Sequence, residues 1–319
     1  MRISAAGRNA LTSCVAAAML AGCGGSQPLG TPGAISQKTI PHATATSLAD
    51  HTSGSEDLLY VGSYDSGLFI LSYPEGQVVA TFQPVWGHAM GLCSDSEGDV
   101  FVLVDQGVEG YIEKYARGAT TPITMLDDKY IPEQCAVDSV TGNLAVTNND
   151  GETPTLAIYQ GAQGNPTYYA DSSMDHIYSC AYDESGDLFV DGWDGSMPTL
   201  AEIPYGGGSF TNIMLNELLK YDVGSLQWVG DYLAMSVKNV IYHIQTSGST
   251  STIIGKTRLA RKMRSPWEID GTTLVTTYLK RASEVAYWKY PRGGAPTQVL
   301  KEFNPSSIDG LTISVGSTR

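Results

Sequence analysis

Basic residues are scarce in this chain. Its 319 residues include 19 Lys and Arg against 33 Asp and Glu, which gives a formal net charge of −14. Proteins that bind nucleic acid need cationic side chains to neutralise the phosphates. The charge balance therefore argues against a nucleic-acid partner. It also opposes close approach of the protein to an anionic membrane surface.

Long apolar runs are missing as well. After residue 22, no stretch is long and apolar enough to predict a membrane-spanning helix. The signatures of serine hydrolases, dinucleotide-binding folds and P-loop nucleotidases are absent in the contexts that those motifs require. These common catalytic classes are therefore not expected.

The start of the chain has the pattern of a secretory signal. Arg2 and Arg8 precede a run of small and apolar residues that is too short to span a membrane. The motif Leu20–Cys23 (Leu-Ala-Gly-Cys) follows, and it resembles the lipobox of bacterial lipoproteins. The resemblance implies that Cys23 is lipidated and becomes the first residue of the mature chain. An ordinary signal peptide with an incidental cysteine is the alternative.

These features divide the chain into three parts. Residues 1–22 are the expected lipoprotein signal peptide, and residues 23–55 the lipidated cysteine and a flexible tether, because their Gly-, Ser-, Thr- and Pro-rich composition cannot form a core. Residues 56–319 form the expected folded domain. Loss of Arg2 and Arg8 leaves a formal charge of −16. We therefore expect an exported protein, anchored by lipid to a bacterial membrane in the cell envelope and facing the periplasm or the exterior.

The folded part is built from repeats. Short apolar, β-prone segments recur at intervals of 41, 44, 44, 45 and 41 residues. They begin at Leu59, Val100, Leu144, Leu188, Leu233 and Leu274. A period of about 40–50 residues with several strands in each repeat is typical of a β-propeller. Frequent glycine and β-branched residues disfavour a helical solenoid.

Most repeats share one order of elements. A polar turn, such as 95–99, 138–143 or 183–187, supplies Gly with Asp or Asn for a tight hairpin. The apolar strand follows, and two further strands complete the repeat. The sequence thus predicts an all-β fold, a propeller of six four-stranded blades. The first repeat lacks an obvious first strand, whereas residues 308–313 are left over, so we predict that this C-terminal strand closes blade one and protects open sheet edges.

Two of these segments resemble known propeller repeats. Residues 180–191 are similar to the NHL-repeat and gluconolactonase/regucalcin-like propellers, and Leu59–Ser63 resembles the YVTN-type repeats. The lactonase relatives imply Ca²⁺ or another divalent metal on the axis, held by carboxylate and amide oxygens. The repeat positions that could supply such ligands are Glu133, Asn148, Asp191 and Glu268. The ligand pattern of that family is not reproduced around them, so we expect no cofactor.

Propeller ligands usually bind where loops of several blades converge. The loops after each second strand and between repeats carry aromatic, carboxylate and amide side chains. The candidate ligand-binding rim consists of His88, Glu133, His176, Trp193, Asp194, Trp267 and Glu268. These side chains predict a non-catalytic binding module for a glycan, a peptide or a partner protein. A metal-dependent lactonase or lyase is the alternative, and a solvated rim with some aromatic packing is a third interpretation.

Cys93, Cys135 and Cys180 occupy equivalent first-strand positions in three successive repeats. Cysteines of an exported protein are expected to pair, but a disulfide needs Cα atoms within about 7 Å. We expect equivalent positions in neighbouring blades to lie farther apart. The prediction is therefore unpaired, buried cysteines where the blades converge. A three-thiolate metal site would need a histidine pattern that the sequence does not show.

One segment reverses the charge of the chain. Lys256, Arg258, Arg261, Lys262 and Arg264 crowd the connection between repeats five and six. The cluster is either a docking patch for phosphate, lipid headgroups or an acidic partner, or a solvated loop that faces the carboxylates of neighbouring blades.

Overall fold

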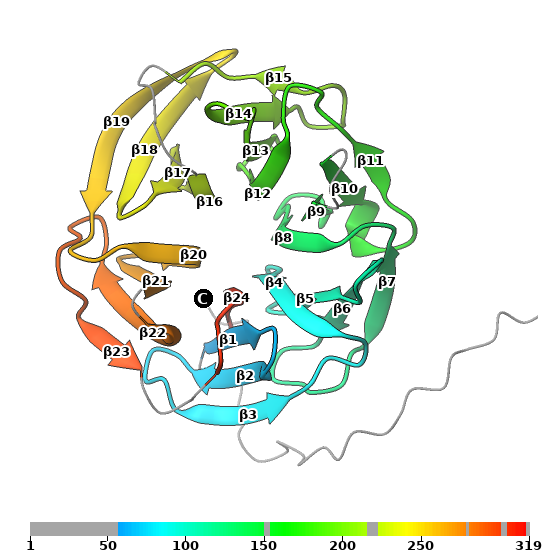
Figure 1. Ribbon diagram of the computed structural model, residues 1–319, viewed down its shortest axis with the longest axis vertical. Coiled ribbons are helices and arrows are strands. Elements are labelled where there is room, and N and C mark those ends of the chain that lie inside the picture. Colours follow the sequence, from blue (N-terminus) through cyan, green and yellow to red (C-terminus); the bar gives the residue numbers. More distant parts are fainter. Residues whose placement is uncertain (1–56, 150–153, 216–222, 279–280, 301–304, 317–319) are drawn as a thin grey trace, which may run out of the picture. The chain divides into compact units, whose positions relative to one another are not determined.

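The computed structural model describes residues 57–149, 154–215, 223–278, 281–300 and 305–316. The described residues form 24 β-strands and one short 3₁₀ helix, Gln160–Ala162. The strands make six antiparallel sheets of four strands each, arranged as blades around a central axis (Figure 1). This confirms the predicted six-bladed propeller. The predicted signal peptide and tether lie outside the described residues, and none of the described helical residues forms a segment able to cross a bilayer.

The strands of each blade are named from the axis outward. Blade one contains β24 (Gly310–Ser314), β1 (Leu58–Ser63), β2 (Gly67–Ser72) and β3 (Val78–Phe82). Blade two contains β4 (His88–Ser94), β5 (Val100–Asp105), β6 (Gly110–Tyr115) and β7 (Thr124–Asp128). Blade three contains β8 (Pro132–Val137), β9 (Leu144–Asn148), β10 (Thr155–Tyr159) and β11 (Thr167–Tyr169).

The second half of the ring follows the same order. Blade four contains β12 (His176–Tyr182), β13 (Leu188–Trp193), β14 (Pro198–Ile203) and β15 (Thr211–Asn212). Blade five contains β16 (Val223–Val229), β17 (Tyr232–Val237), β18 (Val240–Ser247) and β19 (Thr250–Arg258). Blade six contains β20 (Met263–Asp270), β21 (Thr273–Tyr278), β22 (Arg281–Lys289) and β23 (Gln298–Leu300).

The hydrophobic core is divided among the interfaces between neighbouring blades. Each of six buried clusters combines residues of two adjacent blades. Between blades two and three, for example, Phe101 and Leu103 share a cluster with Val146 and Tyr159. The second strand of a blade is covered on both faces, and five of the six residues of β5 are buried. This double burial explains the uninterrupted apolar runs from which the repeats were identified.

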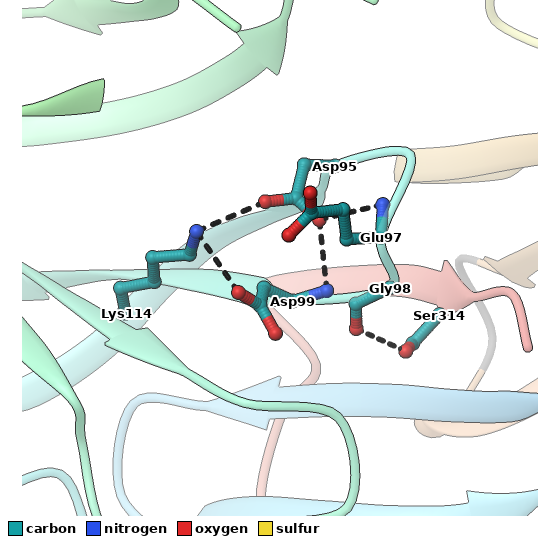
Figure 2. Close-up of polar contacts among 6 residues, drawn as sticks. All are labelled: Asp95, Glu97, Gly98, Asp99, Lys114 and Ser314. Carbon is teal, nitrogen blue, oxygen red and sulfur yellow. Dashed lines mark hydrogen bonds and ion pairs between the residues drawn. The ribbon is translucent and has the colours of Figure 1, made fainter. Parts of the chain in front are cut away.

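The polar turns between first and second strands form as the sequence predicts. In blade two, Asp95 Oδ1 accepts hydrogen bonds from the backbone N–H groups of Glu97 (3.0 Å) and Asp99 (2.9 Å), as Figure 2 shows. Gly98 has a φ of +84°, which residues with a side chain rarely adopt. Lys114 of β6 forms ion pairs with Asp95 (3.1 Å) and Asp99 (2.9 Å) (Figure 2). These contacts fix the turn against the third strand of its blade.

The C-terminal strand β24 closes the ring, which confirms the prediction from the unpaired ends of the sequence. It pairs antiparallel with β1. The N–H of Ile313 donates to Glu268 Oε2 of blade six at 2.9 Å, and Ser94 Oγ of blade two donates to the carbonyl of Ile313 at 2.8 Å. Ser314 Oγ donates to the carbonyl of Gly98 in the blade-two turn (Figure 2). The strand is therefore bonded to the blades on both sides of its own.

The expectation of unpaired cysteines is wrong for two of the three. Cys93 of β4 and Cys135 of β8 form a disulfide between blades two and three, with Cα atoms 5.7 Å apart. The first strands are the innermost ones and converge on the axis (Figure 1), so equivalent positions in neighbouring blades come within disulfide range. Cys180 is buried and unpaired, as predicted, and burial raises the pKa of its thiol.

Candidate functional site

One end of the ring gathers the starts of the first strands and the ends of the second strands. These strands are antiparallel neighbours, so His88 lies opposite Asp105 and His176 lies opposite Trp193. Because the first strands line the axis, their starts surround one opening of the central channel. We use the name channel mouth for six aromatic and polar residues at this end: Tyr64, His88, Glu133, Asn149, His176 and Trp193.

A chain of hydrogen bonds joins blades three and four at the channel mouth. Asn149 Nδ2 donates to Glu133 Oε1 at 3.3 Å, and His176 Nδ1 lies 2.7 Å from Asn149 Oδ1. An amide oxygen only accepts, so this imidazole carries its proton on Nδ1. Burial raises the pKa of Glu133, although the Asn149 bond and the nearby His176 oppose the shift. The Asn149 amide thus fixes the orientation of both the Glu133 carboxylate and the His176 imidazole.

A second group joins blades one and two. The rings of Tyr64 and His88 are stacked, with centroids 4.1 Å apart and planes 8° from parallel. His88 Nδ1 donates to the carbonyl of Tyr64 at 2.8 Å, and the N–H of Tyr64 donates to Asp309 Oδ2 at 2.9 Å. His88 is exposed, and Tyr64 is 37% exposed. The pair therefore presents a fixed aromatic surface to solvent.

Trp193 and Asp194 are neighbours in the sequence but differ in their exposure and contacts. Trp193 is half-buried at the end of β13, directly opposite His176. Asp194 is exposed, and its Oδ1 accepts from the N–H groups of Ser196 (2.9 Å) and Met197 (2.6 Å). The Asp194 carboxylate thus stabilises its own turn, while Trp193 extends the surface of the mouth.

The central channel contains a cavity of about 250 Å³, lined by residues of all six innermost strands. Its polar lining side chains include Ser94, Gln134, Ser179, Ser225, Gln227, Glu268 and Thr312. A water molecule occupies about 30 Å³ in the liquid, so the cavity has room for several waters or one small polar molecule.

Trp267 and Glu268 lie in the channel wall and not at its mouth. The strand β20 begins at Met263, so both residues are at mid-strand. Trp267 is 6% exposed, within the cluster between blades five and six. Glu268 lines the cavity while its carboxylate holds Ile313, and burial raises its pKa to about 7. Both side chains therefore contribute to packing or ring closure, and Glu268 also faces the channel.

The four positions considered for a metal do not form one site. Asn148 is 1% exposed and donates to the Asp128 carboxylate at 3.3 Å. Asp191 is buried and accepts from Ser179 N–H (2.9 Å) and Oγ (2.6 Å). Among the described residues, no three His, Cys, Asp or Glu side chains gather as ligands. These positions do not fit the divalent-metal site that the lactonase resemblance implies.

Two buried carboxylates support the loops that lead into the mouth, and sequence reasoning missed both. Glu113 accepts from the N–H groups of Val85 (3.1 Å) and Trp86 (3.0 Å), just before His88. Burial raises its pKa. Asp128 accepts from the N–H of Tyr130 at 3.2 Å, just before Glu133.

Tyrosine hydroxyls complete the surroundings of Asp128. Tyr159 and Tyr168 donate to its two oxygens at 3.0 Å each. Burial raises the pKa of Asp128, and burial beside that carboxylate raises the pKa of Tyr168 to about 12. The only signal in the sequence was an acidic residue within or at the end of an apolar strand.

Comparison with known proteins shows the fold. No family model and no curated protein matches the chain. A chain in the crystal structure of a nidogen/laminin complex gives a TM-score of 0.62 at 13% identity, over 82% of this chain and 99% of that one. The chain shares the fold of such β-propellers. Identity this low carries no function with it.

Two solved structures of bacterial proteins are also similar to this chain in fold. A protein of unknown function from Bacteroides caccae gives a TM-score of 0.59 at 10% identity, over 82% of this chain and 99% of that one. A putative 6-phosphogluconolactonase from Bacteroides fragilis gives 0.52 at 14% identity, with the same two coverages. The fold is therefore common to proteins with different descriptions.

Proposed function

We propose that this protein is an exported, lipid-anchored binding protein whose propeller holds a glycan at the channel mouth. The observation that carries the proposal is the convergence of aromatic and hydrogen-bonding side chains from blades one to four around one opening. The stacked Tyr64 and His88 offer an aromatic face, and Trp193 lies at the same end of the ring. The Glu133–Asn149–His176 chain offers fixed polar groups for hydroxyls.

The arrangement suits binding better than chemistry. Small-ligand sites combine apolar or aromatic surface with a few oriented polar groups. The mouth supplies both, and the buried Glu113 and Asp128 hold the loops before His88 and Glu133 in place. A rigid site loses little freedom when the ligand binds, which favours affinity. One structurally similar chain was crystallised in a nidogen/laminin complex, so a propeller of this fold takes part in a protein complex there.

The lipid anchor rests on the sequence. Cys23 directly follows Leu20–Gly22 after a basic start and a short apolar run. Two or more acyl chains are enough for stable membrane attachment. The anchor would hold the propeller at the cell envelope, where glycans of the wall and the surface are available as ligands.

A glycan array probed with the mature chain tests the ligand. We expect His88→Ala with His176→Ala to weaken the binding of any captured glycan by at least about tenfold, or about 1.4 kcal/mol. Tyr205→Ala is the matched control, because Tyr205 is a 60% exposed aromatic on the turn after β14, at the opposite end of the blade. Equal losses for the mouth and control variants would contradict a site at the mouth. Capture of a peptide or protein, with no glycan bound, would replace the ligand class.

Labelled palmitate tests the anchor. Expressed in a bacterial host, the chain is expected to incorporate label and to fractionate with membranes, while Cys23→Ser does neither. Membrane fractionation of Cys23→Ser equal to that of the parent would refute lipidation at this residue.

A further inference from the structure

The charge of this protein is segregated around the ring. Residues 57–212 contain 23 Asp and Glu but only 3 Lys and Arg. Residues 223–300, which form blades five and six, contain 10 Lys and Arg and 4 Asp and Glu. Residues 223–300 therefore carry a formal net charge of +6 (10 − 4), and residues 57–212 carry −20 (3 − 23). Blades five and six are cationic although the whole chain is anionic.

The fold brings three basic segments together where blades five and six meet. Leu259 donates to the carbonyl of Asn239 at 2.8 Å, and Met263 donates to the carbonyl of Lys238 at 3.3 Å. Ala260 donates to the carbonyl of Gly294 at 2.7 Å. The turn 238–239, the segment 256–262 and the turn 289–294 are thus hydrogen-bonded neighbours, although they are far apart in the sequence.

The turn 289–294 can lie this close to the segment 256–262 only because residue 293 is a glycine. Gly293 has a φ of +68°, and a Cβ there would lie 2.3 Å from the carbonyl oxygen of Arg258. The N–H of Gly294 donates to that same carbonyl at 2.9 Å. Arg292 is consequently held close to Arg258. The backbone contacts therefore bring these basic segments together.

The basic seam is the set of exposed cations on these three segments: Lys238, Lys256, Arg258, Arg261, Lys262, Lys289 and Arg292. The carboxylates described in blades five and six lie mostly elsewhere. Glu268 lines the channel, Glu284 is buried, and Asp270 is half-buried next to the turn that joins β20 and β21. The fourth carboxylate, Asp231, is exposed on the turn between β16 and β17. Among the described residues of blades five and six, exposed cations therefore outnumber exposed carboxylates, and the seam is a cationic surface.

We propose that the basic seam docks the propeller on an anionic lipid bilayer. The choice of a bilayer rests on the proposed anchor, which would keep the domain beside one. The proposed lipidated cysteine and tether, residues 23–55, would span about 30 Å as a random coil. It leads to Asp57 in blade one, which adjoins blade six. Clustered Lys and Arg side chains are attracted to anionic headgroups within a Debye length, while the acidic blades are repelled. The bilayer therefore orients the ring with the seam toward it.

Vesicle binding tests the seam without the anchor. The mature chain from residue 23, carrying Cys23→Ser, is mixed with vesicles of equal parts phosphatidylglycerol and phosphatidylcholine, and separately with pure phosphatidylcholine vesicles. We expect binding to the anionic vesicles alone, lost when the ionic strength rises from about 0.05 to about 0.5 M. The seam variant, Arg258→Gln, Lys262→Gln, Lys289→Gln and Arg292→Gln, is expected to bind at least about tenfold more weakly.

A matched variant separates the seam from net charge. Gln106→Glu, Thr121→Glu, Gln163→Glu and Ser172→Glu change the total charge by the same amount at exposed positions of blades two to four. This control is expected to keep most of the vesicle binding. Both variants are expected to have the same melting temperature as the parent. Absence of parental binding, or equal losses in the two variants, would overturn the proposal.

A soluble polyanion is the competing partner for the basic seam. Binding of inorganic polyphosphate without binding of anionic vesicles would overturn the bilayer proposal, because the partner would then be a free polyanion. The assay contains no acyl chain. A negative vesicle result therefore leaves the palmitate test unaffected, and a failure of palmitate labelling leaves the vesicle result unaffected.

Discussion

Replacement of Ile313 by alanine tests the ring closure at one side chain. Ile313 of β24 is 2% exposed and lies in the cluster between blades one and six, with Leu59 and Val285 among its neighbours. Truncation of a buried isoleucine to alanine costs about 2–5 kcal/mol, because the transfer free energy is lost and a cavity remains. Domains of this kind are stable by about 5–15 kcal/mol in total. Ile313→Ala is therefore expected to remove a large fraction of the free energy of unfolding.

The matched control is the same substitution on an exposed strand. Ile254 of β19 is 49% exposed, so Ile254→Ala is expected to change stability by about 0.5 kcal/mol or less. Urea unfolding followed by tryptophan fluorescence measures both variants, with an unchanged slope showing that the same surface unfolds. Chains that end before residue 310 are expected to lose the cooperative transition. Equal midpoints for Ile313→Ala and Ile254→Ala would refute the closure of blade one by β24.

Two further predictions concern the inner strands. Burial raises the pKa of Glu268 from 4.5 to about 7, so the folded state holds this proton more tightly than the unfolded state does. The resulting stability is fully present below about pH 4.5 and is lost as the pH rises through 7, by an amount of a few kcal/mol. Glu268→Gln cannot ionise and should lose less stability between pH 5 and pH 8, whereas parallel urea curves for parent and variant would contradict this. Cys93 and Cys135 close a loop of 42 residues, so Cys93→Ser with Cys135→Ser should lower stability by up to about 4 kcal/mol. Dithiothreitol should destabilise the parent but not the double variant, and insensitivity of the parent would argue against the bond.

The blades could be predicted from the repeats, because second strands that are buried on both faces need unbroken apolar runs. The closure could be predicted because the first repeat lacks a strand and residues 308–313 are left over. The distance between neighbouring blades was not accessible in the same way. Cys93 and Cys135 were therefore expected to lie too far apart, although the innermost strands bring their Cα atoms to 5.7 Å. Spacing alone does not report how closely strands converge on an axis.

The candidate site was predicted in part. His88, Glu133 and His176 all lie at one end of the ring, and the structure joins two of them through Asn149. Trp267 was assigned to the same rim because it follows the connection between repeats five and six. The eight-residue strand β20 starts earlier, at Met263, and carries a register shift before Trp267. The residue therefore lies deeper in the channel wall, where it packs between blades.

The contacts of β24 also make blade one depend on a segment that lies far from it in the sequence. β1 is synthesised about 250 residues before its inner partner, and the Asp57 carboxylate accepts from the N–H of Gly316 at 2.8 Å. Without β24, the inner edge of β1 is open, and Ile313 is missing from the cluster between blades one and six. A chain cut before residue 310 would keep the sequence of β1 to β23 but lack the strand that closes blade one. Among the described strands, blade one is therefore the first to begin and the last to be completed.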